Sequence, residues 1–110
     1  MKMYIYNVTV NVDDSAINQW TTWMRETHIP DVLQTGLFLG ATMSRLMVEE
    51  ESGTTFSIQY KLKDEESFRL YQEMYAPALQ ADHKKRFEEK TVAFRTMMEV
   101  LAEFTAERLD

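Results

Sequence analysis

The sequence predicts a single α+β domain of order β-α-β-β-α-β, with a four-stranded antiparallel sheet and both helices on one of its faces. Three observations lead to this fold class. Residues 4–12 alternate between two faces, two further strand patterns flank a short acidic turn, and two helical stripes follow aspartates suited to N-capping. The 110 residues, 45% of them apolar, are expected to form one domain over 1–110.

The first strand and the first helix have the clearest patterns. In residues 4–12, β-branched and aromatic residues recur with period two, which is typical of a strand with one buried face. Asp13, Asp14 and Ser15 can cap the helix that follows. Because Pro30 disfavours helix at the preceding residue, we expect this helix to end near His28, with a short turn up to Gly36. The helical stripe comprises Ile17, Trp20, Thr21, Met24 and His28, and Trp23 lies off it.

The middle of the chain predicts a hairpin and a divided helix. Residues 37–50 and 54–63 read as strands, although the alternation of the first is irregular and leaves its facing open. Asp64 can cap the next helix, whose apolar stripe runs through Phe68 and Tyr71. Pro77 must kink or split that helix because it lacks an N–H and clashes one turn back.

Residues 91–104 fit either a strand or a helix. Ala93, Met97, Leu101 and Phe104 form a helical stripe, whereas the alternation around Arg95 and Glu99 fits a strand. We predict a strand over 91–101, because the preceding elements need a fourth strand to complete the sheet.

The sheet face away from the helices is expected to mix apolar and polar side chains, which suggests a homodimer formed through this face. If the phase of the strands holds, that face carries Ile5, Asn7, Thr9, Asn11, Leu39, Met43, Arg45, Gln59, Lys61, Arg95, Met97 and Glu99.

The stretches MYIYNVTVNVDDSAINQWTTWMRETHIPDVLQTGLF and VAFRTMMEVL resemble an uncharacterised bacterial family of domains of unknown function. The whole chain resembles the dimeric α+β barrel superfamily, ferredoxin-like domains that pair sheet to sheet. That resemblance implies the fold and dimerisation but no activity. The superfamily includes antibiotic-biosynthesis-type monooxygenases and haem-degrading enzymes. Of the residues that mark the haem-degrading enzymes, Asn7 and His83 have the expected places, but the tryptophan of the second helix has no counterpart here.

Six residues are candidates for ligand binding, and each also has a purely structural interpretation. His28 can act as a base or simply bond helix-end carbonyls, and Trp23 can stack on a ligand or pack on the second helix or a partner. Arg45 and Arg95 can hold an anion or pair across strands. Asn7 completes the set through the resemblance alone, and His83 otherwise reads as part of a solvated helix face. No spacing identifies a catalytic set or a metal site, and we expect no cofactor.

Composition disfavours several classes of protein. The formal charge is −6, and the one basic cluster, residues 83–90, is interrupted by Glu88 and Glu89, so a nucleic-acid partner is not expected. The chain has no cysteine, which excludes disulfides and thiolate chemistry. We expect neither a signal peptide nor a membrane helix, and hence a cytoplasmic protein.

The sequence therefore favours a non-catalytic homodimer that binds a small molecule or a protein partner. The alternative is a cofactor-independent monooxygenase or isomerase-like enzyme, with His28 as base and Arg45 or Arg95 holding an anionic substrate. The surroundings of His28 distinguish the two hypotheses. A buried His28 that lines a cavity with a shifted pKa supports the enzyme, and one that is exposed or bonded only to helix-end carbonyls supports the binder.

Overall fold

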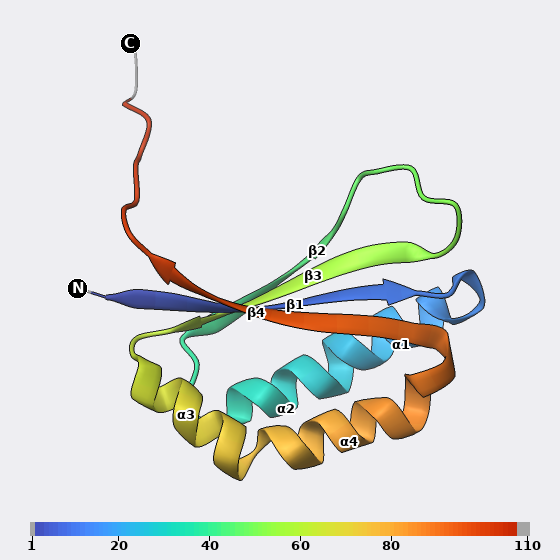
Figure 1. Ribbon diagram of the computed structural model, residues 1–110, viewed down its shortest axis with the longest axis horizontal. Coiled ribbons are helices and arrows are strands. Elements are labelled where there is room, and N and C mark those ends of the chain that lie inside the picture. The colour runs from blue at the N-terminus through green and yellow to red at the C-terminus, as the bar shows by residue number, and fades with distance from the viewer. Residues whose placement is uncertain (1, 108–110) are drawn as a thin grey trace.

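The computed structural model describes residues 2–107 and has the predicted order of elements. Figure 1 shows the helices gathered on one face of a twisted sheet. The strands are β1 (Met3–Val12), β2 (Gly40–Arg45), β3 (Thr54–Leu62) and β4 (Thr91–Val100), and the helices are α1 (Ile17–Trp23), α2 (Ile29–Gln34), α3 (Glu65–Met74) and α4 (Ala76–Phe87). Three short turns, η1 (Asp14–Ala16), η2 (Met24–His28) and η3 (Glu88–Lys90), complete the chain path.

The sheet has the strand order β2-β3-β1-β4, and all its pairs are antiparallel. The prediction of a strand over 91–101 is confirmed, because Thr91–Val100 pairs with the whole of β1. These residues form a strand and not a helix, despite their helix-like stripe, because the backbone of β1 needs hydrogen-bonding partners on the edge that β3 does not cover. Val8 lies between Ile58 of β3 and Arg95 of β4, which fixes the register.

The core lies between the sheet and the helices. The alternation predicted for residues 4–12 is confirmed, since Val10 and Val12 are fully buried with Ile58 and Leu62 of β3. Trp20 of α1 is also fully buried and packs on Phe56, with ring centroids 4.9 Å apart. This packing fixes which face of α1 meets the sheet.

The predicted composition of the opposite face needs correction. Residues opposite each other in an antiparallel pair share a face. Arg95 and Met97 pair with Val8 and Tyr6 and therefore lie on the helix side, as do Glu99, Met43 and Arg45, while Leu39 precedes β2. The outer face instead carries Val92, Phe94 and Met98 beside the predicted Ile5, Asn7, Thr9, Asn11, Gln59 and Lys61. The error was one of phase, because β2 and β4 are edge strands whose exposed positions mask the alternation.

The first helix does not end at His28, contrary to the prediction. It passes through η2, a π-helical turn in which the N–H of Ile29 bonds to the carbonyl of Met24, and continues as α2. Pro30 occupies the first turn of α2, where its missing N–H is tolerated. The wider π-turn thus absorbs the proline without breaking the helical rod.

The second helical region behaves as predicted. The Asp64 side chain accepts a hydrogen bond of 2.7 Å from the backbone N–H of Ser67 and caps α3. The rod then breaks at Tyr75, and α4 starts afresh with Pro77 in its first turn. Pro77 therefore splits the helix rather than merely bending it.

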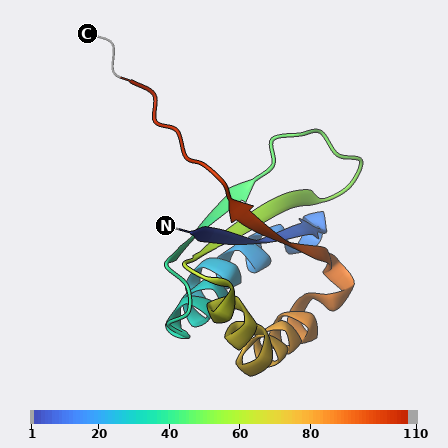
Figure 2. The same ribbon diagram turned by 60° about the vertical axis from the view of Figure 1, so that its left-hand side comes forward.

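Two segments project from the sheet on the side away from the helices, as both ribbon views show (Figures 1 and 2). The first is the 46–53 loop between β2 and β3. It replaces the outer half of the predicted 37–50 strand, and it ends at Gly53 with φ +74°. The second is the C-terminal segment, residues 101–107, which leaves the end of β4 in an extended path and is exposed throughout. Both flank the outer face of the sheet.

Candidate functional site

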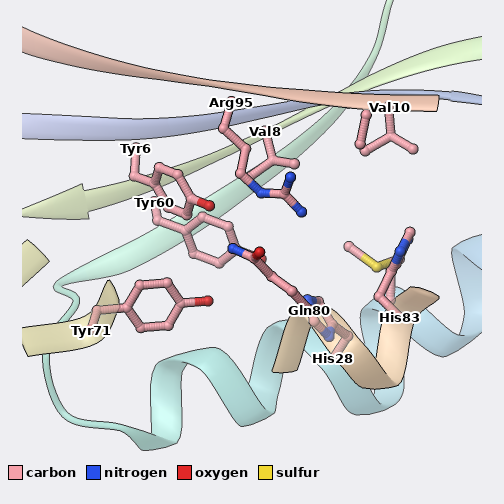
Figure 3. A pocket seen from close by; sticks show the side chains of 11 residues that line it. Tyr6, Val8, Val10, His28, Tyr60, Tyr71, Gln80, His83 and Arg95 are labelled. Carbon is pink, nitrogen blue, oxygen red and sulfur yellow. The ribbon is translucent and has the colours of Figure 1, made fainter. Parts of the chain in front are cut away.

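A small cavity lies between the sheet and the helices, and polar side chains from both layers point into it (Figure 3). Its volume is about 30 Å³, which is room for one or two water molecules. Arg95 reaches into the cavity from β4 and Gln80 from α4. The lining comprises Tyr6, Val8, Val10, Met24, His28, Tyr60, Tyr71, Gln80, His83, Ala93 and Arg95.

Three tyrosines form the aromatic wall of this cavity. The ring of Tyr6 lies 5.9 Å from those of Tyr60 and Tyr71, measured between centroids, and all three residues are buried. Burial raises the pKa of each hydroxyl, and the positive charge of Arg95 only partly opposes this. The three groups are therefore neutral hydrogen-bond donors at physiological pH.

The π-turn places His28 in the cavity. A π-turn joins residues five apart, so the rings of Trp23 and His28 lie one above the other, with centroids 4.9 Å apart and planes 27° apart. Burial lowers the pKa of His28 to about 4, with further lowering from His83 and Arg95, and Asp82 acts in the opposite direction. His28 is thus a neutral imidazole at physiological pH.

His83 faces His28 from α4, and Trp20 fixes its tautomer. The two imidazole centroids are 5.9 Å apart, and the indole N–H of Trp20 donates to Nε2 of His83 at 2.9 Å. Because Nε2 accepts this bond, the proton of the neutral ring must be on Nδ1. Burial and Arg95 both lower the pKa of His83. His83 is therefore a donor through Nδ1, and His28 is the histidine whose basic nitrogen accepts no hydrogen bond from the described residues.

Arg95 supplies positive charge to the cavity. It lies opposite Val8 on the helix side of β4, and it remains exposed at the cavity mouth because β4 is an edge strand. None of the ion pairs within residues 2–107 involves Arg95. Arg95 can therefore bind an anion without displacing an internal carboxylate.

Trp23 packs behind the histidines and does not line the cavity. Its ring contacts Phe87 at 5.5 Å and His83 at 5.8 Å between centroids, and the guanidinium of Arg86 lies 5.3 Å from its centre. Its buried Nε1 has no hydrogen-bond partner among the described residues. The position of Trp23 matches the interpretation in which it packs on the second helix.

Asn7 and Arg45 lie outside the cavity. Asn7 is on the outer face of the sheet, where its amide accepts from Ser57 at 2.6 Å and donates to Thr9 at 2.9 Å. It is thus on the opposite side of the sheet from His83, and the combination suggested by the haem-degrading enzymes is not assembled. Arg45 lines a separate groove beside α1.

Sequence reasoning missed Gln80 and assigned the three tyrosines to the core alone. A signal was present in α4, where Ala76, Gln80, His83 and Phe87 recur at helical spacing. The two ends of this stripe are buried and apolar, while its middle is polar. Polar residues in the middle of an inward-facing stripe indicate a cavity.

Two further observations concern residues 2–107. No three histidine, aspartate or glutamate side chains gather there in a way that could hold a metal ion. Over the same residues, no helix is long and apolar enough to cross a bilayer.

A family model described as a domain of unknown function, DUF4286, matches residues 3–101. The chain belongs to this family. The match covers every strand and helix described above, which confirms the resemblance to an uncharacterised family. A comparison with curated proteins found no match.

Solved structures with the same fold are similar to this member of the DUF4286 family at low sequence identity. A dimeric ferredoxin-like protein from an uncultured marine organism has a TM-score of 0.71 and 12% identity, covering 94% of this chain and 98% of that one. A candidate antibiotic biosynthesis monooxygenase from Bacillus cereus has a TM-score of 0.68 and 13% identity, covering 96% of this chain and 100% of that one. SnoaB, a cofactor-independent oxygenase from Streptomyces nogalater, has a TM-score of 0.60 and 11% identity, covering 97% of this chain and 95% of that one. The chain therefore has the ferredoxin-like fold of dimeric α+β barrel proteins.

Proposed function

We propose that this DUF4286 protein binds a small organic anion in the cavity between its sheet and helices and acts on it as a cofactor-independent enzyme. The proposal rests on the observation that a neutral His28 and the positively charged Arg95 line the same cavity. His28 is half-buried, lines the cavity and has a lowered pKa, and this combination favours the enzyme over the passive binder.

The chemistry that suits this cavity is proton abstraction. His28 takes a proton from an O–H or activated C–H group of the substrate and becomes an imidazolium, and the electron pair stays on the substrate as an oxyanion. Arg95, the tyrosine hydroxyls and the Gln80 amide offer positive charge and donors to that oxyanion. A base with a pKa of about 4 is weak, so the substrate must be acidified by Arg95, as in an enol or a phenol.

Binding requires the cavity to enlarge. Sites for small molecules commonly have roughly 300–1,000 Å³, about ten times or more the present volume. Gln80 is the flexible side chain that fills the space, and α4 is separated from α3 by the break at Tyr75. Withdrawal of Gln80 with a small shift of α4 would open the cavity between the tyrosine wall and the histidines.

A cytoplasmic homodimer formed through the outer sheet face is part of the proposal. Phe94 is 62% exposed there, next to Val92 and Met98, and an apolar patch of this kind indicates a partner. The two projecting segments flank this face. The dimeric ferredoxin-like protein of similar fold supports a second copy as that partner.

The second candidate is the non-catalytic binder, which the small volume of the cavity favours. Exchange of solvent deuterium separates the two. The compound released from gently purified protein by denaturation is returned to fresh protein in D₂O, and its deuterium content is followed by mass spectrometry. The enzyme proposal predicts exchange that is much faster with the wild type than with His28→Gln. Binding with equal, slow exchange in both proteins would contradict catalysis and leave a binding protein.

A further inference from the structure

A groove separate from the cavity runs between α1 and the edge strand β2. It is an open depression of about 410 Å³. Its lining combines apolar side chains, hydroxyl groups and two arginines, Arg25 from η2 and Arg45 from β2. The groove is lined by Ile17, Thr21, Arg25, Met43, Ser44, Arg45, Thr54 and Phe56.

The groove suits an extended, acidic peptide. β2 is the first strand in the sheet order, so one side of its backbone has no strand partner within residues 2–107. An edge of this kind can accept an added strand, which takes main-chain hydrogen bonds from it. None of the ion pairs among the described residues involves Arg25 or Arg45, so both are available to carboxylates.

The C-terminal segment has the matching chemistry. Residues 101–107, with the sequence LAEFTAE, are extended and exposed, so that Leu101, Glu103 and Glu107 share one side of the segment and Phe104 lies on the other. Leu101 is 87% exposed and Phe104 is 93% exposed, so the described residues of the same copy cover little of either side chain. Glu103 and Glu107 supply the negative charge.

The segment cannot occupy the groove of its own copy. Val100 lies opposite Met3 at one end of the sheet, whereas Phe56 in the groove lies opposite Val10, and β4 and β2 are opposite edges. Arg45 of β2 lies opposite Phe56, so Val100 and Arg45 are on the order of 27 Å apart for strands spaced ~4.8 Å apart with ~3.3 Å per residue. Residues 101–107 span at most about 25 Å, and they leave β4 in the direction away from the groove.

We propose that the C-terminal segment of one copy lies along β2 in the α1–β2 groove of a second copy, with Glu103 and Glu107 against Arg25 and Arg45. Leu101, on the same side of the extended segment as the two glutamates, would rest on the apolar side chains of the groove, and Phe104 would point to the other side, beside Ser44. The inference rests on the proposed homodimer and deepens it, because each copy then completes a surface of the other. The occupant is a peptide of the same chain and not a free small molecule.

Cysteine pairing between copies tests this directly, because the chain has no native cysteine. A Ser44→Cys chain is mixed with an isotope-labelled Phe104→Cys chain and oxidised, and the cross-linked species is weighed. Each chain has one thiol, so a mixed disulfide can form only between copies. The control pair combines Phe104→Cys with Lys85→Cys on the exposed side of α4. We expect a yield of mixed disulfide several-fold above the control.

The charge pairing is tested on the same readout. Arg25→Glu with Arg45→Glu on the Ser44→Cys chain should reduce the yield to the control level, and Glu103→Arg with Glu107→Arg on the other chain should restore it. Lys84→Glu, a charge change on α4, should have no effect.

Other outcomes overturn the inference in distinguishable ways. An intact dimer in native mass spectrometry without the cross-link would overturn this placement and leave the homodimer. A monomer would overturn both. A dimer that fails to cross-link but binds octanoate through Arg25 and Arg45 would assign the groove to small amphipathic acids.

Discussion

The indole N–H of Trp20 donates a hydrogen bond to Nε2 of His83 across the interface between α1 and α4, at 2.9 Å. This bond joins the fully buried Trp20 to the half-buried His83, and it also determines which nitrogen of His83 carries the proton. One contact therefore serves both the packing of the core and the chemistry of the cavity.

Trp20→Phe should destabilise the protein and release His83. The substitution leaves Nε2 buried without its donor, which lowers the free energy of unfolding by about 1–3 kcal/mol, with a further loss from the smaller ring. The pKa of His83 should rise, because Nε2 becomes free to accept a proton. Urea denaturation and an NMR titration of the two histidines measure these effects.

Trp23→Phe is the matched control. Its Nε1 is buried without a partner, so removal of that N–H should offset part of the packing loss, and the destabilisation should be clearly smaller than for Trp20→Phe. Equal losses in the two variants would show that the hydrogen bond to His83 contributes nothing.

The shifted pKa of His28 predicts a pH dependence of stability. The unfolded chain binds a proton at this residue near pH 6.5 and the folded chain only near pH 4, so folding loses stability as the pH falls through this window. The full effect is about 3 kcal/mol, reached near and below pH 4 and absent above pH 7. His28→Gln should remove this part of the dependence. Urea denaturation of the wild type and of His28→Gln at pH 7 and pH 5 measures this difference. An equal loss of stability in both proteins between the two pH values would contradict the lowered pKa of His28.

Gly53→Ala should destabilise the β2–β3 loop more than Gly36→Ala does. Both glycines have positive φ, +74° and +79°, where a residue with a side chain costs about 1–2 kcal/mol. A Cβ at Gly53 would also lie 2.7 Å from the carbonyl oxygen of Val12, whereas at Gly36 it meets open space. Thermal unfolding should show the larger loss for Gly53→Ala, and an equal loss would mean that the loop moves away from β1 without penalty.

Phe94→Lys should dissociate the proposed homodimer and leave the fold intact. Phe94 is exposed on the outer face, so a charge there does not disturb the core but opposes burial against a second copy. Light scattering after size exclusion would show the change in mass, with circular dichroism as the test of folding. Gln59→Lys, on the polar half of the same face, is the control and should perturb association less.

Most of the fold could be predicted from the sequence, because the strongest patterns depend only on residues close together in the chain. The alternation of residues 4–12, the cap at Asp64 and the split at Pro77 each depend on neighbouring residues, and each was predicted. The facing of Arg95 and Met43 was not, because it depends on pairing with a distant strand. The path through Pro30 was also missed, since a π-turn has no clear sequence signature.

The candidate site was predictable only in part for the same reason. His28, His83 and Arg95 were named individually, but nothing in their spacing brings a helix end, a second helix and the last strand to one cavity. Gln80 and the three tyrosines read as ordinary helix and core residues until the layers were packed together. Asn7 lies on the strand that the resemblance implies, but its side chain is on the outer face of the sheet, away from the cavity.

Native mass spectrometry of gently purified protein, with a denatured control, shows whether the cavity at His28 and Arg95 holds a ligand. We predict a dimer that carries extra mass, that this mass leaves on denaturation, and that Arg95→Gln loses it while Arg45→Gln retains it. A wild-type dimer of bare protein mass would contradict a ligand site at His28 and Arg95.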